Sequence, residues 1–270
     1  MKSFGILIHI RLESSRLPEK HIKLANNKYL LEHQIIRIKD RMNPKDSNIK
    51  IILNVSEVSK DKYFDILNSI AKKHNVELFF GDNDNIPLRI YQCSKKHNLT
   101  HIISVDGDDI LVSSQQILNI YNYFTNSSEY NLLYTLNLPL GMNVFGFTHK
   151  VLEENYLNEV KSYEVGWPCI FNFDLVNIDE KDKVNIIETK DVRMSEINTG
   201  YQQNNFYDKL RFTLDYIEDY NLVKEILNNI SSTSTDEEIV NYVCKNELFN
   251  INIKNIEKWY DNFIKGKENN

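Results

Sequence analysis

The stretch that decides the fold is FGILIHI (residues 4–10) followed directly by RLESSRLPEK (residues 11–20). The first part is a continuous apolar run of strand length, which is typical of a strand buried on both faces of a sheet. The second part adds three cations and two hydroxyl groups, namely Arg11, Arg16, Lys20, Ser14 and Ser15. Ligands of open α/β sheets bind at the carboxyl ends of the strands. The stretch therefore predicts an anion site suited to a triphosphate.

Short apolar runs alternate with amphipathic stretches over the first half of the chain. Further strands are predicted at 49–54, 76–80, 101–105 and 130–136. The helices predicted between the strands are 30–41, 61–74, 86–97 and 114–124. In the first of these helices, Leu31, Ile35 and Ile38 recur at helical spacing. Alternating strands and helices need right-handed crossovers, so we predict a doubly wound α/β fold with a mostly parallel sheet.

The alternation breaks between residues 137 and 205, where proline and glycine interrupt the pattern. Three large aromatic side chains, Trp167, Phe171 and Phe173, lie there in a stretch with weak periodicity. Because exposed aromatic residues are enriched at interfaces, we interpret 137–205 as an insertion that serves as a lid, or as an arm for the acceptor or for a second subunit. An ordinary surface excursion with a small core of its own is the alternative.

The remainder of the chain is predicted to hold one strand and three helices. Their ranges are 209–214 for the strand, then a helix ending at residue 227, 236–245 and 255–263. Thr235 followed by three acidic residues is typical of a helix start, where the N-cap and the helix dipole favour such side chains. We therefore divide the chain into a nucleotide-binding domain, 1–230, and a helical C-terminal extension, 231–270.

Composition limits the class of protein and the compartment. A net charge of −6 without a basic stripe argues against binding of nucleic acid by a cationic surface. Three cysteines far apart, Cys93, Cys169 and Cys244, indicate neither a zinc site nor a disulfide framework. No apolar run approaches the ~18 residues that a membrane span needs, and the N-terminal run is too short for a signal peptide. We expect a cytoplasmic protein with no membrane span.

Carboxylates follow two of the predicted strands. Asp106, Asp108 and Asp109 come directly after the run 101–105. Three carboxylates this close repel one another, and the repulsion is tolerated when a cation lies between them. Oxygen ligands beside a nucleotide favour Mg²⁺. Asp215 follows the predicted strand 209–214, so both groups reach one metal if their strands are neighbours. The alternatives are an acidic turn with Asp109 as a helix N-cap, and a solvated basic turn for 11–20.

These segments together resemble the cytidylyltransferases that make CMP-sugars, which include the CMP-Kdo and CMP-sialic acid synthetases and the spore-coat polysaccharide SpsF-like proteins. RLESSRLPEK is similar to the family signature A-R-x-x-S-T-R-L-P-G-K, and KYLLEH (28–33) is similar to G-K-P-L-L-E-H. Gly81-Asp82 with RIYQ (89–92) resembles G-D…L-D-R-Y-Y-Q, Gly107-Asp108 matches G-D, and LDYIED (214–219) matches V-D-T-P-E-D. The resemblance runs in register from residue 4 to about residue 228.

The resemblance implies a Rossmann-like nucleotide-binding fold, a homodimer, and transfer of CMP from CTP to an acidic sugar or to a phosphorylated or phosphonate acceptor, with release of pyrophosphate. Such products are precursors of surface polysaccharides or glycoconjugates. The implied catalytic residues are Arg11, Arg16, Lys20, Asp108 and Asp215. The residues implied at the nucleotide are Arg11, Ser14, Ser15, Arg16, Lys20, Arg89, Asp106 and Asp108. Asp108 and Asp215 are the implied ligands of Mg²⁺.

Five positions depart from the family pattern. Glu13 and Glu19 stand where the phosphate loop commonly has glycine. Ile10 stands for the usual alanine, Leu88 for an aspartate and Ile217 for a proline. An added carboxylate beside a triphosphate is unfavourable unless it points away or contacts a cation of the acceptor. Two other functions remain open. A metal-dependent glycosyltransferase also uses Asp-x-Asp, although the cluster in 11–20 favours nucleotidyl transfer; the second is a non-catalytic nucleotide-binding protein.

Overall fold

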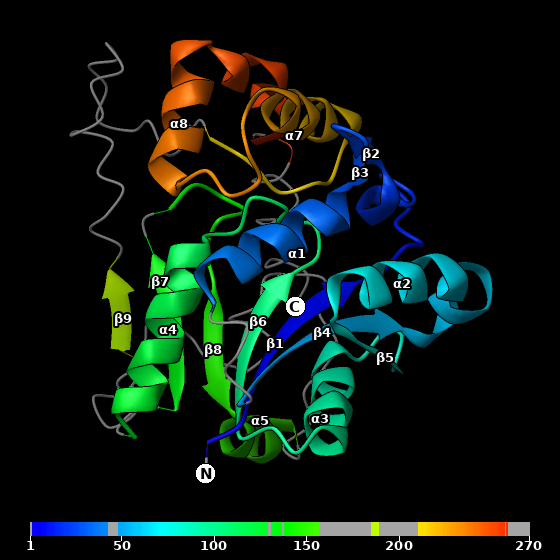
Figure 1. Cartoon of the computed structure of the whole chain (residues 1–270), viewed down its shortest axis with the longest axis vertical. Helices are drawn as coiled ribbons and strands as arrows, with labels where there is room; N and C mark the ends of the chain where they lie inside the picture. Colours follow the sequence, from blue (N-terminus) through cyan, green and yellow to red (C-terminus); the bar gives the residue numbers. More distant parts are fainter. Residues whose placement is uncertain are drawn as a thin grey trace.

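The structure is a computed structural model that describes residues 2–42, 48–128, 131–136, 138–156, 185–188, 210–256 and 258. A seven-stranded sheet forms its centre (Figure 1). From one edge to the other, its strands are β5 (Glu77–Gly81), β4 (Ile49–Ser56), β1 (Phe4–Ile10), β6 (His101–Asp106), β8 (Phe145–Thr148), β7 (Leu132–Leu136) and β9 (Asn185–Glu188). A separate two-stranded sheet pairs β2 (Leu24–Ala25) with β3 (Lys28–Tyr29).

The central sheet is mostly parallel, as the sequence predicts. Strands β5, β4, β1 and β6 are parallel neighbours. Strand β8 is antiparallel to both β6 and β7, and β9 is parallel to β7. Among these seven strands β8 alone therefore runs against the others, and the carboxyl ends of β1 and β6 meet at one edge of the sheet.

Helices cover both faces of this sheet, which confirms the doubly wound fold. One face is covered by α1 (Leu30–Arg41), α2 (Lys60–His74) and α4 (Ser114–Asn126), and the other by α3 (Ile86–Lys96) and α5 (His149–Tyr156). Side chains of β1 alternate between these faces: Ile6 and Ile8 pack in the core with α1, α2 and α4, whereas Leu7 packs with α3 and α5. Both faces of β1 are buried, which explains its continuous apolar sequence.

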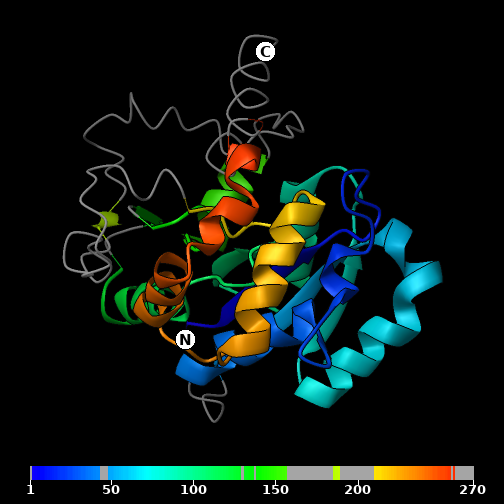
Figure 2. The same cartoon turned by 90° about the horizontal axis from the view of Figure 1, so that it is seen from above.

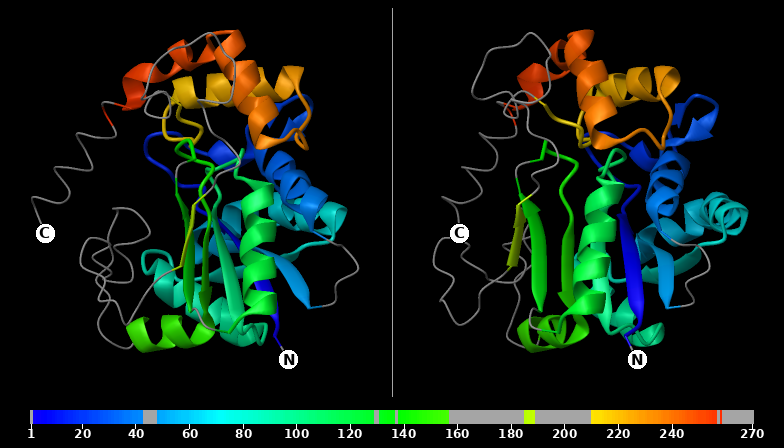
Figure 3. Two further views of the ribbon diagram at one scale, coloured as in Figure 1. Left: turned by 90° about the vertical axis from the view of Figure 1, so that its left-hand side faces the viewer. Right: turned by 60° about the vertical axis from the view of Figure 1, so that its left-hand side comes forward.

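A second core lies beyond the carboxyl ends of the strands. It is built by α7 (Ile217–Asn229), α8 (Asp236–Lys245) and the 3-10 helix η5 (Leu248–Ile251), which cap this end of the sheet (Figure 3). Seen from above, α7 crosses the sheet end (Figure 2). Thr235 caps α8 as predicted: its Oγ1 accepts from Glu238 N at 3.2 Å and Glu238 Oε2 accepts from Thr235 N at 2.7 Å.

The strand predicted at 209–214 is wrong for the part that the structure describes, 210–214. Arg211 forms one isolated parallel bridge with Leu140, and Phe212 N donates to Leu140 O at 2.7 Å. The alternating apolar side chains Leu210, Phe212 and Leu214 are all buried in the second core. An alternating pattern reports a buried face, and here helices rather than a neighbouring strand provide it.

Three other predictions fall partly or wholly outside the described residues. The helix predicted at 255–263 is described only at its start, where residues 253–256 and 258 are helical. The aromatic residues of the predicted arm, Trp167, Phe171 and Phe173, lie outside the described ranges. The segment 137–205 contributes β8 and α5 to the central fold, and β9 to its edge.

Within the described ranges, no helix is both long enough and apolar enough to span a membrane.

Candidate active site

Lys20 joins three segments at the carboxyl end of the sheet. It opens the 3-10 helix η1 (Lys20–Ile22) and is only 7% exposed. Its Nζ donates to Asp108 Oδ2 at 2.5 Å and to the Leu214 carbonyl oxygen at 2.8 Å, and lies 4.0 Å from Asp215 Oδ1. The ammonium group therefore lies between the two carboxylates that the sequence predicts as metal ligands. Lys20 thus joins the loop that carries it to the turn after β6, through Asp108, and to the segment before α7, through Leu214 and Asp215.

Arg16 contacts the Asp215 carboxylate from the solvent side. Its NH2 group donates to Asp215 Oδ1 at 2.7 Å, and its guanidinium carbon lies 5.6 Å from the centroid of the Tyr216 ring. The side chain remains 49% exposed, which leaves it accessible to a ligand. Partial burial lowers the pKa of Arg16, but the Asp215 carboxylate and Tyr216 outweigh this effect, so the pKa is raised.

Asp108 belongs to a compact group of carboxylates. Asp106, Asp108 and Asp109 each offer one oxygen, and these oxygens lie within 4.8 Å of one another. The pKa of Asp109 is held well above its usual range. Burial is the main cause, and the neighbouring carboxylates of Asp108 and Asp106 add to it. Burial also opposes ionisation of Asp108, but Lys20 outweighs it and lowers the pKa of that carboxyl. A cluster of oxygen donors with this crowded charge fits a hard divalent cation such as Mg²⁺.

Arg11 and Arg89 lie by a second loop, between β5 and α3. Arg11 is exposed, with its NH2 group 4.0 Å from Asp84 Oδ1. Arg89 is 2% exposed, donates from NH1 to the Asp82 carbonyl oxygen at 3.0 Å, and has a buried Nε without a hydrogen-bond partner in the described part of the chain. Burial lowers the pKa of Arg89 to about 10, so the group stays charged at neutral pH. These two arginines are not in contact with Lys20 in any interaction of the described residues.

The two serines of the loop 11–20, Ser14 and Ser15, differ in burial and in hydrogen bonding. Ser14 Oγ accepts from Leu17 N at 3.4 Å, which closes a local turn, and its side chain is half-buried. Ser15 is exposed. The structure thus brings Arg16, Lys20, Asp108 and Asp215 together, while the serines line the loop beside them.

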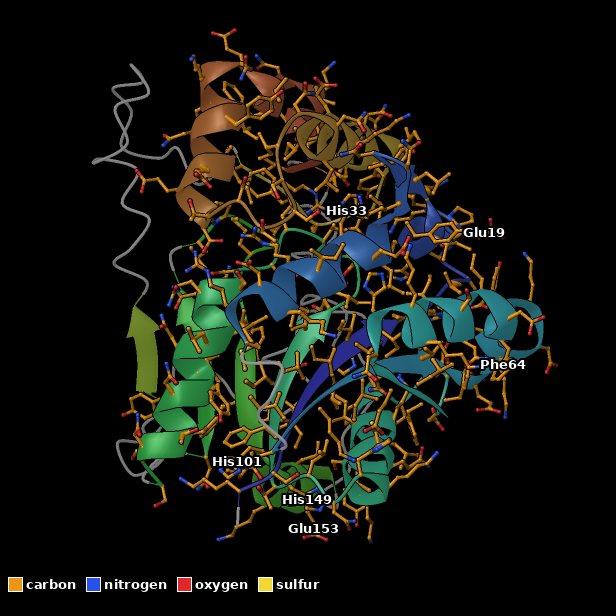
Figure 4. All side chains as sticks on the ribbon, in the orientation of Figure 1. Glu19, His33, Phe64, His101, His149 and Glu153 are labelled. Atoms are coloured by element: carbon orange, nitrogen blue, oxygen red, sulfur yellow. The ribbon has the colours of Figure 1, made fainter. Side chains whose placement is uncertain are left out.

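The two glutamates that depart from the family pattern turn toward α2. Glu13 Oε2 accepts from Ser59 Oγ at 2.7 Å. Glu19 Oε1 accepts from Lys62 Nζ at 3.0 Å and from the Tyr63 hydroxyl at 2.8 Å, and Figure 4 shows Glu19 at the side of the molecule near α2. Neither carboxylate contacts Lys20 or Arg16 in the described structure. Glu19 has φ 58°, in the left-handed region, which glycine adopts with less strain than other residues.

His21 and Gly107 hold the loop 11–20 against the turn 106–109, and sequence reasoning did not single out the histidine. His21 is buried, with Nδ1 2.9 Å from the Gly107 carbonyl oxygen and Nε2 3.1 Å from the Arg11 carbonyl oxygen. Burial, then Lys20, lower the pKa of His21 to about 4. A Cβ on Gly107 would lie 2.2 Å from the His9 carbonyl oxygen, so only glycine permits this close approach.

Arg211 is the other functional candidate that the sequence left unmarked. It is fully buried and donates from NH2 to Asp215 Oδ2, on the side opposite Arg16. Asp215 therefore accepts from two arginines and lies near Lys20. Two of these cations, Arg16 and Lys20, lie almost 200 residues before Asp215 in the chain, so no local pattern could have shown this grouping.

Comparisons with known proteins agree with this geometry. The chain is 24% identical over 264 residues to an uncharacterized protein of Methanocaldococcus jannaschii, covering 96% of this chain and 98% of that protein. It is 32% identical over 136 residues to a 3-deoxy-manno-octulosonate cytidylyltransferase of Rickettsia prowazekii, covering 48% of this chain and 50% of that relative. The structure of a cytidylyltransferase from Leptospira borgpetersenii shares the fold, with a TM-score of 0.71, 23% identity, and coverage of 92% of this chain and 97% of that one.

The family itself follows from a wider match. The family model described as cytidylyltransferase matches residues 6–174, more than half of the 270 residues. The matched range contains the loop 11–20 and the turn 106–109, which the fold brings together at Lys20. The chain therefore belongs to the cytidylyltransferase family of enzymes.

Proposed function

We propose that the chain transfers CMP from CTP to an acidic sugar, or to a phosphorylated or phosphonate acceptor, with release of pyrophosphate and dependence on Mg²⁺. The products would be precursors of surface polysaccharides or glycoconjugates. The observation that carries the proposal is the meeting of Lys20 and Arg16 with Asp108 and Asp215 at one end of the sheet. Cations for a polyphosphate and carboxylates for a metal are both needed for nucleotidyl transfer, and they occur here side by side.

The cations of the loop would bind the departing pyrophosphate. Attack of an acceptor oxygen on the α-phosphorus of CTP breaks the bond to the β-phosphate oxygen and moves negative charge onto pyrophosphate. Arg11, Arg16 and Lys20 would neutralise that charge, and Ser14 and Ser15 would donate to phosphate oxygens. Preorganised cations of this kind stabilise the transition state without reorganisation at the moment of reaction.

The carboxylates would hold the metal. Asp108 and Asp215 are the proposed ligands. The Lys20 ammonium lies 2.5 Å from one and 4.0 Å from the other, so it would move aside for a metal that bridges them. Asp106 and Asp109 add oxygen donors on the Asp108 side. When bound, Mg²⁺ supplies charge neutralisation and polarisation at the α-phosphate. Arg89, buried near the exposed Arg11, would bind the nucleotide or an anionic group of the acceptor.

The test is pyrophosphate release from each of four nucleoside triphosphates with a panel of acidic acceptors, with and without Mg²⁺. We expect release with CTP and Mg²⁺ only, and loss of release in Asp108→Asn and Asp215→Asn while both variants stay folded. Asp65→Asn is the matched control, because Asp65 is an exposed residue of α2 and makes none of the contacts described for the site. Full activity in either of the first two variants would contradict the metal assignment.

The other functions predict different results in the same experiment. A glycosyltransferase would consume a nucleotide-sugar and release no pyrophosphate from CTP. A non-catalytic protein would bind CTP without turnover on any acceptor. The homodimer that the family resemblance implies stays a prediction, because much of 137–205 lies outside the described residues. Its test is the molar mass in solution by light scattering.

A further inference from the structure

Asp219 holds the backbone that carries Asp215. Its side chain is fully buried at the start of α7. Asp219 Oδ2 accepts from the backbone N–H of Asp215 at 3.0 Å and of Tyr216 at 2.9 Å. The direction in which the Asp215 side chain leaves the backbone is therefore set by the Asp219 carboxylate.

The other oxygen of Asp219 is held by the chain after α8. Asn252 and Asn255, both 1% exposed, donate from Nδ2 to Asp219 Oδ1 at 2.8 Å and 3.1 Å. Asn252 Nδ2 also donates to the Arg211 carbonyl oxygen at 2.9 Å. The side-chain amide of Asn252, at the end of η5, thus connects to both Asp219 and Arg211, the two residues that contact Asp215.

Arg211 completes the connection. Its fully buried guanidinium group donates to Asp215 Oδ2, and its Nε lies 3.4 Å from Asp219 Oδ1. The oxygen that receives the two asparagine amides is thus the same one that faces the Arg211 guanidinium. In a buried network each partner orients the next, because an unsatisfied charged group in the interior is costly.

We infer that Asn252 and Asn255 are positioning residues of the active site, which hold Asp215 in place through Asp219 and Arg211. This inference rests on the proposed function for the role of Asp215. It extends the site to the segment after α8, beyond the part of the chain that carries the family resemblance. The physical basis is that these two asparagines donate to a carboxylate which has no solvent contact.

The test compares two variants with a matched control. Asn252→Asp keeps the shape of the side chain, removes the donor and places a second negative charge against Asp219. Asn255→Ala removes one donor and leaves Asn252 in place. Asn246→Ala is the control, because Asn246 Nδ2 donates to the Tyr242 carbonyl oxygen at 2.8 Å on the exposed side of the same region.

We expect the loss to fall on turnover rather than on CTP binding. The kcat of pyrophosphate release should fall on the order of tenfold in Asn255→Ala and about a hundredfold in Asn252→Asp, since a hydrogen bond to a charged group commonly accounts for such factors. The KM for CTP should stay within about twofold of the wild-type value, because loop cations and not Asp219 hold the polyphosphate. Asn246→Ala should match the wild type. Wild-type kcat in folded Asn255→Ala would overturn the inference.

A second readout does not depend on the reaction. In ¹H–¹⁵N spectra, the amide proton signals of Asp215 and Tyr216 should move upfield in Asn255→Ala, because their shared acceptor loosens, and should not move in Asn246→Ala. Unchanged signals would also overturn the inference. If the wild type releases no pyrophosphate from any triphosphate, the proposed function fails while this readout still decides whether the asparagines position Asp215. If Asn252→Asp does not fold, Asn255→Ala provides both measurements.

Discussion

Two arginines, Arg37 and Arg211, are fully buried and pair with aspartates at the starts of α8 and α7, and they bind their partners in different ways. Arg37 donates from Nε to the Val112 carbonyl oxygen at 2.6 Å, and its NH1 and NH2 groups donate to the carbonyl oxygens of Ser232 and Ser234 and to Asp236. Arg211 faces the carboxylates of Asp215 and Asp219. Within the described residues, its Nε and NH1 make no hydrogen bond.

The difference separates a structural ion pair from one that belongs to the active site. The donors of Arg37 end on backbone carbonyls and on one aspartate that also accepts from Ser113 Oγ, so this cluster joins α1, the turn before α4 and α8. The aspartate bound by Arg211 is shared with Arg16 and lies close to Lys20. A change at Arg37 should therefore act on stability, and a change at Arg211 should act on charge at the site.

The largest effect on stability should follow Arg37→Met. This change leaves Asp236 buried without its charge partner, and breaking a buried ion pair commonly costs about 3–5 kcal/mol. Urea unfolding measures the loss, and Arg41→Met, on the partly exposed end of α1, serves as the control. Activity per folded molecule should be retained. A stable Arg37→Met protein without activity would reverse our assignment of the two clusters.

Arg211→Met should give a smaller loss of stability and a large loss of activity. Asp215 keeps Arg16, and Asp219 keeps two asparagines and two backbone amides, so we expect a loss of about 1–3 kcal/mol. Pyrophosphate release should fall by about 10²-fold or more, because the charge and direction of Asp215 change at the site. The comparison is made at a temperature at which both arginine variants are folded. Equal activity in the two variants would remove the distinction between the clusters.

Ser113→Ala should produce a modest loss that is confined to stability. Ser113 caps α4 by accepting from Gln116 N at 3.1 Å, and it donates to Asp236 in the Arg37 cluster. Loss of such a cap costs about 0.5–2 kcal/mol. Ser69→Ala, at an exposed position of α2, is the control. Thermal and urea unfolding should report the change, and a drop in kcat with unchanged stability would contradict it.

The smallest effect at neutral pH should come from His101, at the end of the sheet remote from both clusters (Figure 4), where a substitution should change only the pH dependence of stability. Burial, then Lys2, lower the pKa of His101 from 6.5 to about 4. Between these pH values the unfolded chain binds more protons than the folded one, so stability is full above pH 6.5 and falls as the pH drops toward 4. His101→Phe should flatten this slope in urea unfolding between pH 7 and 4.5. A residual slope should remain from His21, and an unchanged slope would show that His101 does not contribute.

Local sequence patterns predicted most of the helices and strands, because apolar periodicity and capping residues act over a few neighbouring residues. Helix α1 begins and ends where its apolar periodicity does, and α8 begins at the Thr235 cap, because both signals lie within a few residues. The prediction of a strand at 210–214 was wrong because apolar and polar residues alternate in the same way whether the apolar side chains are buried by helices or within a sheet. The loop cations and Asp108 could be predicted because they directly follow strands whose carboxyl ends share an edge.

By itself, the sequence determined the order of the main strands and helices up to residue 136, a mostly parallel sheet and the family of the chain, because these depend on periodicity and on short motifs. Only the tertiary structure decided which charges meet. Lys20 contacts Asp108 and Leu214, which lie 88 and 194 residues away in the chain, and Asp215 is held through Asn252 and Asn255 from beyond α8. Charge pairing in a buried site depends on distances of a few ångströms, and these distances arise only when the second core packs on the end of the sheet.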